Sequence, residues 1–307
     1  MKFEFQSTAA TNPVPVTSAG PGEWSDDTIT YVTVTQDRLH NLRRNFPVVL
    51  PHVDRAVVVD GFSKDGAYEY LQSLAPKVEV FQREWDDSFA NQYNEYLKHL
   101  KGGWVLLCDD DEVPSEEMLT SLRELVKASE GGQKFSLVEF RSNDVSYVEG
   151  DWENRVDNGP CEYYRQIFFK WYPGMKYTVD LHQALQGLRG PVVRHKAHYY
   201  HIKSTKDEFR NACRNWFIAG EWPSGSRSDG IRTAEWHELR ELLAKHHPEA
   251  KLFSGLNSLM VTGSLHPDIE EFIRRNKECR LGEEGETAGE LRAYYRYYFE
   301  LLHPEKG

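Results

Sequence analysis

Four short apolar segments alternate with amphipathic segments along the first third of the chain. The apolar segments are rich in β-branched or aromatic residues, which predicts strands at Thr28–Thr35, Arg55–Asp60, Lys77–Gln82 and Trp104–Asp109. Apolar residues at helical spacing predict helices at Asp37–Leu50, Ala67–Leu74 and Asp86–Leu100, and Pro51 ends the first of them. This alternation predicts an α/β fold, with an open, mostly parallel sheet flanked by helices.

The remainder of the chain predicts a change of architecture. Val192–His201 has the composition of a strand, and Leu181–Gln186 could form a short helix that Gly187 ends. Beyond it, helical spacing recurs at Asp207–Ala219, Thr233–His246, His266–Asn276 and Thr287–Leu302. We therefore expect an α/β domain at 28–205, with halves at 28–112 and 113–205, and a helical C-terminal extension at 206–307. Residues 1–27 lack apolar periodicity and are expected to be a flexible tail.

The strand Trp104–Asp109 ends in three consecutive aspartates, Asp109, Asp110 and Asp111. Asp109 and Asp111 are two residues apart, so their carboxylates could converge on one divalent cation. The same aspartates could instead precede a helix, because Pro114-Ser115-Glu116-Glu117 has the composition of a first helical turn. The segment alone leaves both interpretations open.

Composition narrows the possible partners. The net charge is −11, which disfavours nonspecific binding to nucleic acid polymers or anionic membrane surfaces. No apolar segment approaches the roughly 20 residues of a membrane span, and no secretion signal is recognisable, so we expect a cytoplasmic protein. The four scattered cysteines predict reduced thiols. Neither a dinucleotide-binding glycine fingerprint nor a P-loop motif is present, so a nucleotide diphosphate held by a metal fits the chain better.

Three segments together carry a resemblance to a known family. Val57–Gly66, Trp85–Ala90 with Asn94, and Gly103–Glu112 resemble, in order and spacing, the family-two glycosyltransferases of the GT-A fold. The resemblance implies that Asp109 and Asp111 form an Asp-x-Asp motif, which holds Mn²⁺ or Mg²⁺ against the diphosphate of a nucleotide sugar. It also implies contacts with the nucleotide sugar from Thr35, Asp60, Lys64, Asn94, Asp109, Asp110 and Lys203. The sequence departs from the family at Gln36-Asp37, where relatives commonly have Asn-Glu.

The second half continues the resemblance more weakly. Tyr164–Phe169 and Met175–Leu185 resemble the segment where relatives carry Arg-x-x-Phe and then Val-His-Glu, but Gln183 replaces that glutamate. Glutamine cannot accept a proton at neutral pH, so a role as catalytic base does not transfer to Gln183. Asp180 is the nearest carboxylate that could act as the base. It could instead be the N-cap of the helix expected at Leu181–Gln186.

A histidine-rich strand supplies the remaining candidates. His201 and Lys203 fit the metal-binding histidine and the diphosphate-binding cation of the resembled family, and His198 competes for the metal. Strand alternation is expected to place His198 on the opposite face from His195 and His201.

The resemblance implies an inverting, hexosyltransferase-like enzyme, which moves a sugar from a nucleotide-diphosphate donor to an acceptor hydroxyl. The acceptor could be a glycan, a lipid-linked saccharide, a protein side chain or a hydroxylated nucleobase. Two alternatives remain: a non-catalytic nucleotide-sugar binding protein, which the missing glutamate allows, and a nucleotidyltransferase. The second would be expected to have a glycine-rich loop after its first strand, where this chain has Gln36-Asp37-Arg38.

Overall fold

The computed structural model describes residues 23–133, 135–148, 151–180, 184–204, 214, 234–250, 255–256, 259 and 264–278. Gln183 and the expected helix Thr287–Leu302 lie outside these residues, as do most of the expected tail 1–27 and all of the expected helix Asp207–Ala219 except Arg214.

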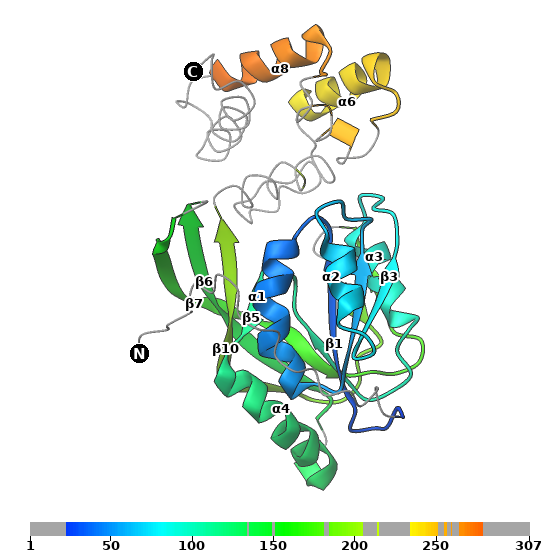
Figure 1. Cartoon of the computed structure of the whole chain (residues 1–307), viewed down its shortest axis with the longest axis vertical. Helices are drawn as coiled ribbons and strands as arrows, with labels where there is room; N and C mark the ends of the chain where they lie inside the picture. The colour runs from blue at the N-terminus through cyan, green and yellow to red at the C-terminus, as the bar shows by residue number, and fades with distance from the viewer. Residues whose placement is uncertain are drawn as a thin grey trace.

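An eight-stranded sheet forms the centre of the molecule, with the strand order β3-β2-β1-β4-β7-β6-β10-β5 (Figure 1). The strands are β1 (Ile29–Thr35), β2 (Arg55–Asp60), β3 (Val78–Gln82), β4 (Trp104–Leu107), β5 (Glu112–Pro114), β6 (Leu137–Val148), β7 (Asp151–Lys170) and β10 (Val192–Ser204). Four of the neighbouring pairs are parallel and three, all involving β7 or β5, are antiparallel. The predicted open, mostly parallel α/β sheet is confirmed.

Side chains at alternate positions of the central strands point to opposite faces of the sheet and pack into two separate hydrophobic cores. On one face, Tyr31, Val58 and Leu106 pack with buried residues of the helices α1 (Leu39–Val49), α2 (Ala67–Ser73) and α4 (Glu116–Ala128). On the other face, Val32, Val57 and Leu107 pack against α3 (Phe89–Leu97) and against Tyr177. Residues of opposite parity thus face opposite helical layers, as the period of two in a strand requires.

Helix capping explains where two of the helices begin. The Ser88 hydroxyl accepts a hydrogen bond from the backbone N–H of Asn91 at the start of α3, and Ser115 does the same for Met118 at the start of α4. The acidic residues Glu116 and Glu117 occupy the first turn of α4, where the helix dipole favours negative charge. The helix start considered at Pro114–Glu117 therefore exists, but the short strand β5 separates it from the aspartate cluster.

Two features were not predicted. The strands β6 and β7 form a long hairpin, and β10 pairs with β6 in parallel, which extends the sheet beyond β4. A second, two-stranded sheet consists of β8 (Lys176–Thr178) and β9 (Ala184–Gln186). The short helix expected at Leu181–Gln186 is therefore wrong at Ala184–Gln186, where pairing with β8 gives extended backbone.

Two further helices, α6 (Ala234–His246) and α8 (Pro267–Glu278), lie together at one end of the molecule (Figure 1). Both agree with the helices expected in the C-terminal extension. Among the described helices, none combines the length and apolar character that a membrane crossing requires.

Candidate functional site

The parallel strands β1, β2 and β4 end at the same edge of the sheet, and their last residues bring polar groups together. The Thr35 hydroxyl at the end of β1 donates a hydrogen bond to the Asp110 carboxylate at 2.8 Å. Asn45 of α1 is fully buried, and its side-chain amide donates to the backbone carbonyls of Asp110 at 2.7 Å and Glu112 at 3.1 Å. The aspartate cluster is therefore fixed by β1 and α1 at the edge where ligands of such sheets bind.

The loop after β1 is hydrogen-bonded to the loop after β2, beside this cluster. Asp60 is fully buried, and its carboxylate accepts hydrogen bonds from the Ser63 backbone N–H at 3.1 Å and from Gln82 at 3.0 Å. The Asp37 carboxylate accepts from the backbone N–H of Lys64 at 2.7 Å, while the Lys64 side chain is exposed. The second carboxylate oxygen of Asp60 is buried without a hydrogen-bond partner among the described residues.

Asp109 is engaged by side chains from two other elements. Tyr93 of α3 hydrogen-bonds to one carboxylate oxygen of Asp109, and Arg165 of β7 lies 3.4 Å from the other. Arg165 also forms a close ion pair with Glu112, whose side chain is fully buried and accepts the Asp109 backbone N–H at 2.9 Å. Although Asp109 and Asp111 have equivalent places in the motif, Asp109 thus belongs to a buried charge network.

Asp111 faces His201 instead. The His201 Nε2 atom lies 3.6 Å from the Asp111 carboxylate, and Nδ1 lies 3.6 Å from the carboxylate of Asp144 on β6. Burial lowers the pKa of His201, but the two carboxylates outweigh it and raise this pKa to about 9. Burial likewise raises the pKa of Asp111, yet the charge and hydrogen bonding of His201 hold it well below its ordinary value. Two carboxylates flanking one imidazole bring oxygen and nitrogen ligand atoms together in a partly buried place.

Asp110 differs again from its two neighbours. Burial and the negative charge of Asp111 raise the pKa of its carboxyl, Arg38 and the Thr35 hydroxyl oppose the shift, and the resulting pKa is about 6. Three consecutive aspartates therefore have three environments: an ion pair with Arg165, a hydrogen bond from Thr35, and contact with His201.

The candidate residues of the histidine-rich strand β10 do not all lie near the aspartates. Lys203 is half-buried, and its positive charge lowers the pKa of both Asp111 and Asp144. His198 lies away from the aspartates, with its ring edge-on to Tyr200 at 4.8 Å. Burial lowers the pKa of His198 and of His195, and Glu117 raises both, which places the two histidines near the same carboxylate. The expected placement of His198 on the opposite face from His195 and His201 stays a prediction, because a register shift between Arg194 and His198 interrupts the regular pairing there.

The structure brings together Thr35, Asp109, Asp110, Asp111, His201 and Lys203, but places two other candidates elsewhere. The Asn94 side-chain amide accepts a hydrogen bond from the backbone N–H of Tyr177 at 2.7 Å and donates one to the Tyr177 carbonyl at 3.0 Å. Asp180 is exposed and accepts the Ser88 hydroxyl at 2.5 Å, at the beginning of α3. The contacts of Asn94 and Asp180 with a substrate remain predictions.

Four residues of this region were not assigned to the site from the sequence: Tyr93, Glu112, Asp144 and Arg165. Glu112 directly follows the aspartates, and Arg165 lies in the segment Tyr164–Phe169 that carried part of the resemblance. Those two could have been proposed from the sequence. Nothing in the sequence context of Asp144 indicates His201 as its neighbour.

Comparison with known proteins agrees with this arrangement. Residues 32–178 match the family model described as glycosyl transferase family 2. The chain is therefore similar to glycosyltransferase family 2 over just under half of its length. The matched segment contains the end of β1, the strands β2 to β4, the whole aspartate cluster, Arg165 and β8, whereas His201 and Lys203 lie beyond it.

Solved structures give more distant likenesses. S. aureus TarS 1-349 in complex with UDP-GlcNAc is 12% identical, with 91% of each chain covered and a TM-score of 0.44. Glucosyl-3-phosphoglycerate synthase from Mycobacterium tuberculosis, in complex with Mn²⁺, UDP and glucosyl-3-phosphoglycerate, is 18% identical, with 40% of this chain and 45% of that chain covered and a TM-score of 0.31. Likenesses this distant add nothing to the family match. No curated protein sequence matches the chain significantly.

Proposed function

We propose that the protein is a metal-dependent, inverting glycosyltransferase, which transfers a hexosyl group from a nucleotide-diphosphate sugar to an acceptor hydroxyl. The observation that carries this proposal is the pairing of Asp111 with His201 at 3.6 Å, beside Asp109 and Asp110 at the ends of the parallel strands. This pairing joins a segment that matches glycosyltransferase family 2 to a strand that lies outside the match.

The side chains present fit a divalent cation. Ligands about 2.0–2.2 Å from one ion at a tetrahedral angle lie roughly 3.3–3.6 Å apart, and Asp111 and His201 have this spacing. Asp109 would have to leave Arg165 or Tyr93 to become a further ligand. Asp109, Asp111 and His201 would hold Mn²⁺ or Mg²⁺, which supplies Lewis-acid stabilisation to the departing diphosphate.

The protein's own groups account for the rest of the proposed reaction. Lys203 adds positive charge near Asp111, on the side where the diphosphate would leave. Thr35, Asp60 and Lys64 are proposed to position the nucleotide, from the loops that surround the cluster.

Asp180 remains the proposed base for the acceptor hydroxyl. It contacts Ser88, which precedes Tyr93 by five residues along α3, so about 7.5 Å along the helix axis separates Ser88 from the tyrosine that binds Asp109. We propose that the Asp180 carboxylate approaches a bound sugar from the side opposite the metal.

Activity measurements on an Asp111→Asn variant test the proposal. Purified protein is incubated with Mn²⁺ and a panel of nucleotide-diphosphate sugars, and release of the nucleotide diphosphate is measured with and without acceptor glycans. We expect turnover by the wild type and a loss of roughly 100- to 1,000-fold in Asp111→Asn, because one electrostatic contact to the leaving group is lost.

Asp26→Asn is the matched control, since Asp26 is exposed and precedes β1 at the opposite end of the sheet. It should retain wild-type turnover. Binding of a sugar nucleotide without any release would favour a non-catalytic binding protein, and pyrophosphate release from a nucleoside triphosphate would favour a nucleotidyltransferase. Full activity of Asp111→Asn would contradict the role of the motif.

A further inference from the structure

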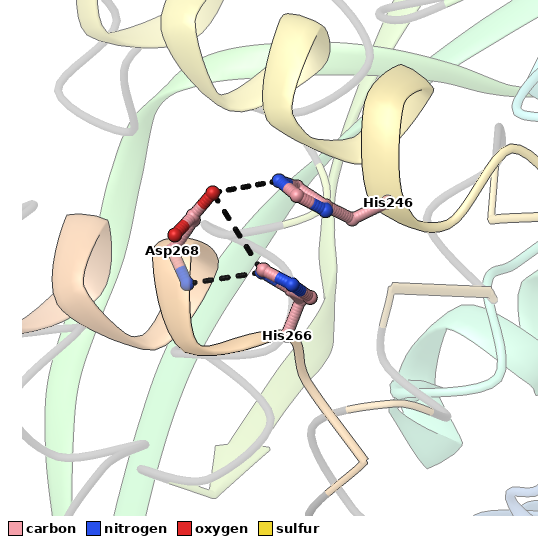
Figure 2. A group of neighbouring side chains, drawn as sticks. All are labelled: His246, His266 and Asp268. Carbon is pink, nitrogen blue, oxygen red and sulfur yellow. Dashed lines mark hydrogen bonds and ion pairs between the residues drawn. The ribbon is translucent and has the colours of Figure 1, made fainter.

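A second group of potential metal ligands lies far from the aspartate cluster in the fold, between the last turn of α6 and the first turn of α8. His246 ends α6, His266 immediately precedes α8, and Asp268 is in the first turn of α8 (Figure 2). One ligand atom from each of the three lies within 4.8 Å of the other two. Within the described part of the chain, no other group of His, Cys, Asp and Glu side chains meets this condition.

The distances suit one tetrahedral ion. The Asp268 carboxylate oxygen lies 2.7 Å from His246 Nε2 and 3.8 Å from His266 Nδ1. Two ligands about 2.0–2.2 Å from a tetrahedral zinc ion lie roughly 3.3–3.6 Å apart. The observed separations fall on both sides of this range, so small side-chain rotations would equalise them without moving the helices.

The backbone around the three side chains already fixes their positions. The His266 carbonyl accepts the N–H groups of Ile269 at 2.9 Å and Glu270 at 3.1 Å, and its own N–H donates to His247 Nε2 at 3.0 Å. The rings of His246 and His266 stack 3.5 Å apart at 12°. Both imidazoles therefore lie next to one another, and one ring has to turn out of the stack before the in-plane lone pairs of both can point at one ion.

Besides the stacking of the rings, two contacts would have to change when an ion binds. The Asp268 backbone N–H donates to His266 Nδ1 at 3.2 Å, and the Lys245 ammonium lies 3.6 Å from the Asp268 carboxylate. The Lys245 side chain is 66% exposed, so it can turn into solvent at little cost. Asp268 and His266 are themselves partly exposed, which leaves an approach for the ion and for a fourth ligand from water.

We propose that His246, His266 and Asp268 bind one borderline divalent transition-metal ion, of which Zn²⁺ is the representative. Two imidazole nitrogens and one carboxylate suit such an ion better than Mg²⁺, which prefers oxygen ligands. The bound ion would fasten α6 to α8. This site is independent of the proposed transfer reaction, because none of its residues belongs to the strand-end cluster.

Titration of the full chain with Zn²⁺ by calorimetry tests the site. His246→Ala and His266→Ala should each lose one Zn²⁺ equivalent per chain, with an affinity loss larger than the roughly 10- to 100-fold that removal of a supporting contact costs. His237→Ala is the matched control, because His237 is an exposed histidine of the same helix, and it should bind like the wild type. Zinc binding at the aspartate cluster is common to all these variants and cancels in the comparison.

A second measurement reports the ligands directly. Co²⁺ added to the wild type should give visible absorption bands typical of tetrahedral nitrogen and oxygen coordination, and Asp268→Asn should weaken them while circular dichroism shows an unchanged helix content. Equal Zn²⁺ stoichiometry in the wild type, His246→Ala and His266→Ala would overturn the proposal, as would the same loss in His237→Ala. The three side chains would then serve only as a hydrogen-bonded contact between helices.

Discussion

At the scale of single residues, the aspartates of the motif differ because their partners come from distant parts of the chain. Arg165 and Glu112 engage Asp109, whereas His201 and Asp144 flank Asp111. The sequence predicted the cluster and its closeness to His201 through the family pattern. It could not predict that Asp144 would lie on the other side of His201, since their proximity depends on the pairing of β6 with β10.

The two histidine candidates give a residue-scale prediction. His201→Ala should lower the affinity for Mn²⁺, because it removes an imidazole 3.6 Å from Asp111. His198→Ala should leave the affinity unchanged, since the His198 ring contacts Tyr200 on the same strand rather than the aspartates. Titration of both variants with Mn²⁺, followed by electron paramagnetic resonance, measures the difference. An effect of His198→Ala alone would move the metal ligand to His198, and no effect of either variant would leave only carboxylates as ligands.

At the scale of elements, the pattern of apolar residues predicted helices and strands that a local sequence signal defines. It missed strands that form through pairing between distant segments. The strands β1 to β4 and the helices α1 to α3 agree with the pattern within a few residues, because each buries an apolar face against its neighbours. The hairpin β6–β7 was missed, since charged residues such as Arg141, Asp144 and Asp157 interrupt any alternation along it. The strand β5 has three residues, too few to give a pattern.

The start of α3 gives an element-scale prediction about Asp180. Ser88 caps α3 and also donates to Asp180. A change of Ser88 tests the cap, and a change of Asp180 tests the carboxylate as the base. Ser88→Ala should cost about 1 kcal/mol in the free energy of unfolding, through loss of the cap, while transfer continues. Asp180→Asn keeps an oxygen that can accept the Ser88 hydroxyl, so it should retain stability and lose transfer because an amide cannot take the proton.

Urea unfolding and initial rates on both variants provide the comparison. Wild-type turnover by Asp180→Asn would show that this carboxylate is not the base, and Asp144, held against His201, would be the next to test. A loss of turnover in Ser88→Ala equal to that in Asp180→Asn would mean that the geometry of the α3 start, and not the carboxylate, limits the reaction.

At the scale of the whole molecule, the candidate site joins the two halves expected within 28–205. Asp109 and Asp111 follow β4 in the first half, whereas Arg165 and His201 come from β7 and β10 in the second. The strands of both halves form one continuous sheet. A ligand bound at the cluster would therefore contact both halves at once, and its binding would oppose their separation on unfolding.

This arrangement leads to a prediction about stability. A nucleotide diphosphate added with Mn²⁺ should raise the free energy of unfolding by about 2.7 kcal/mol at a ligand concentration of 100 Kd, because it binds only the folded chain. The increase should require both components, since the metal joins the diphosphate to Asp111 and His201. Thermal unfolding of the wild type and of Asp111→Asn, with each component alone and with both, measures this requirement.

Asp26→Asn should respond like the wild type, because its side chain is 82% exposed and distant from the strand ends. An equal response of Asp111→Asn would place the nucleotide elsewhere, and because stabilisation needs no turnover, it would do so whether or not the protein is an enzyme.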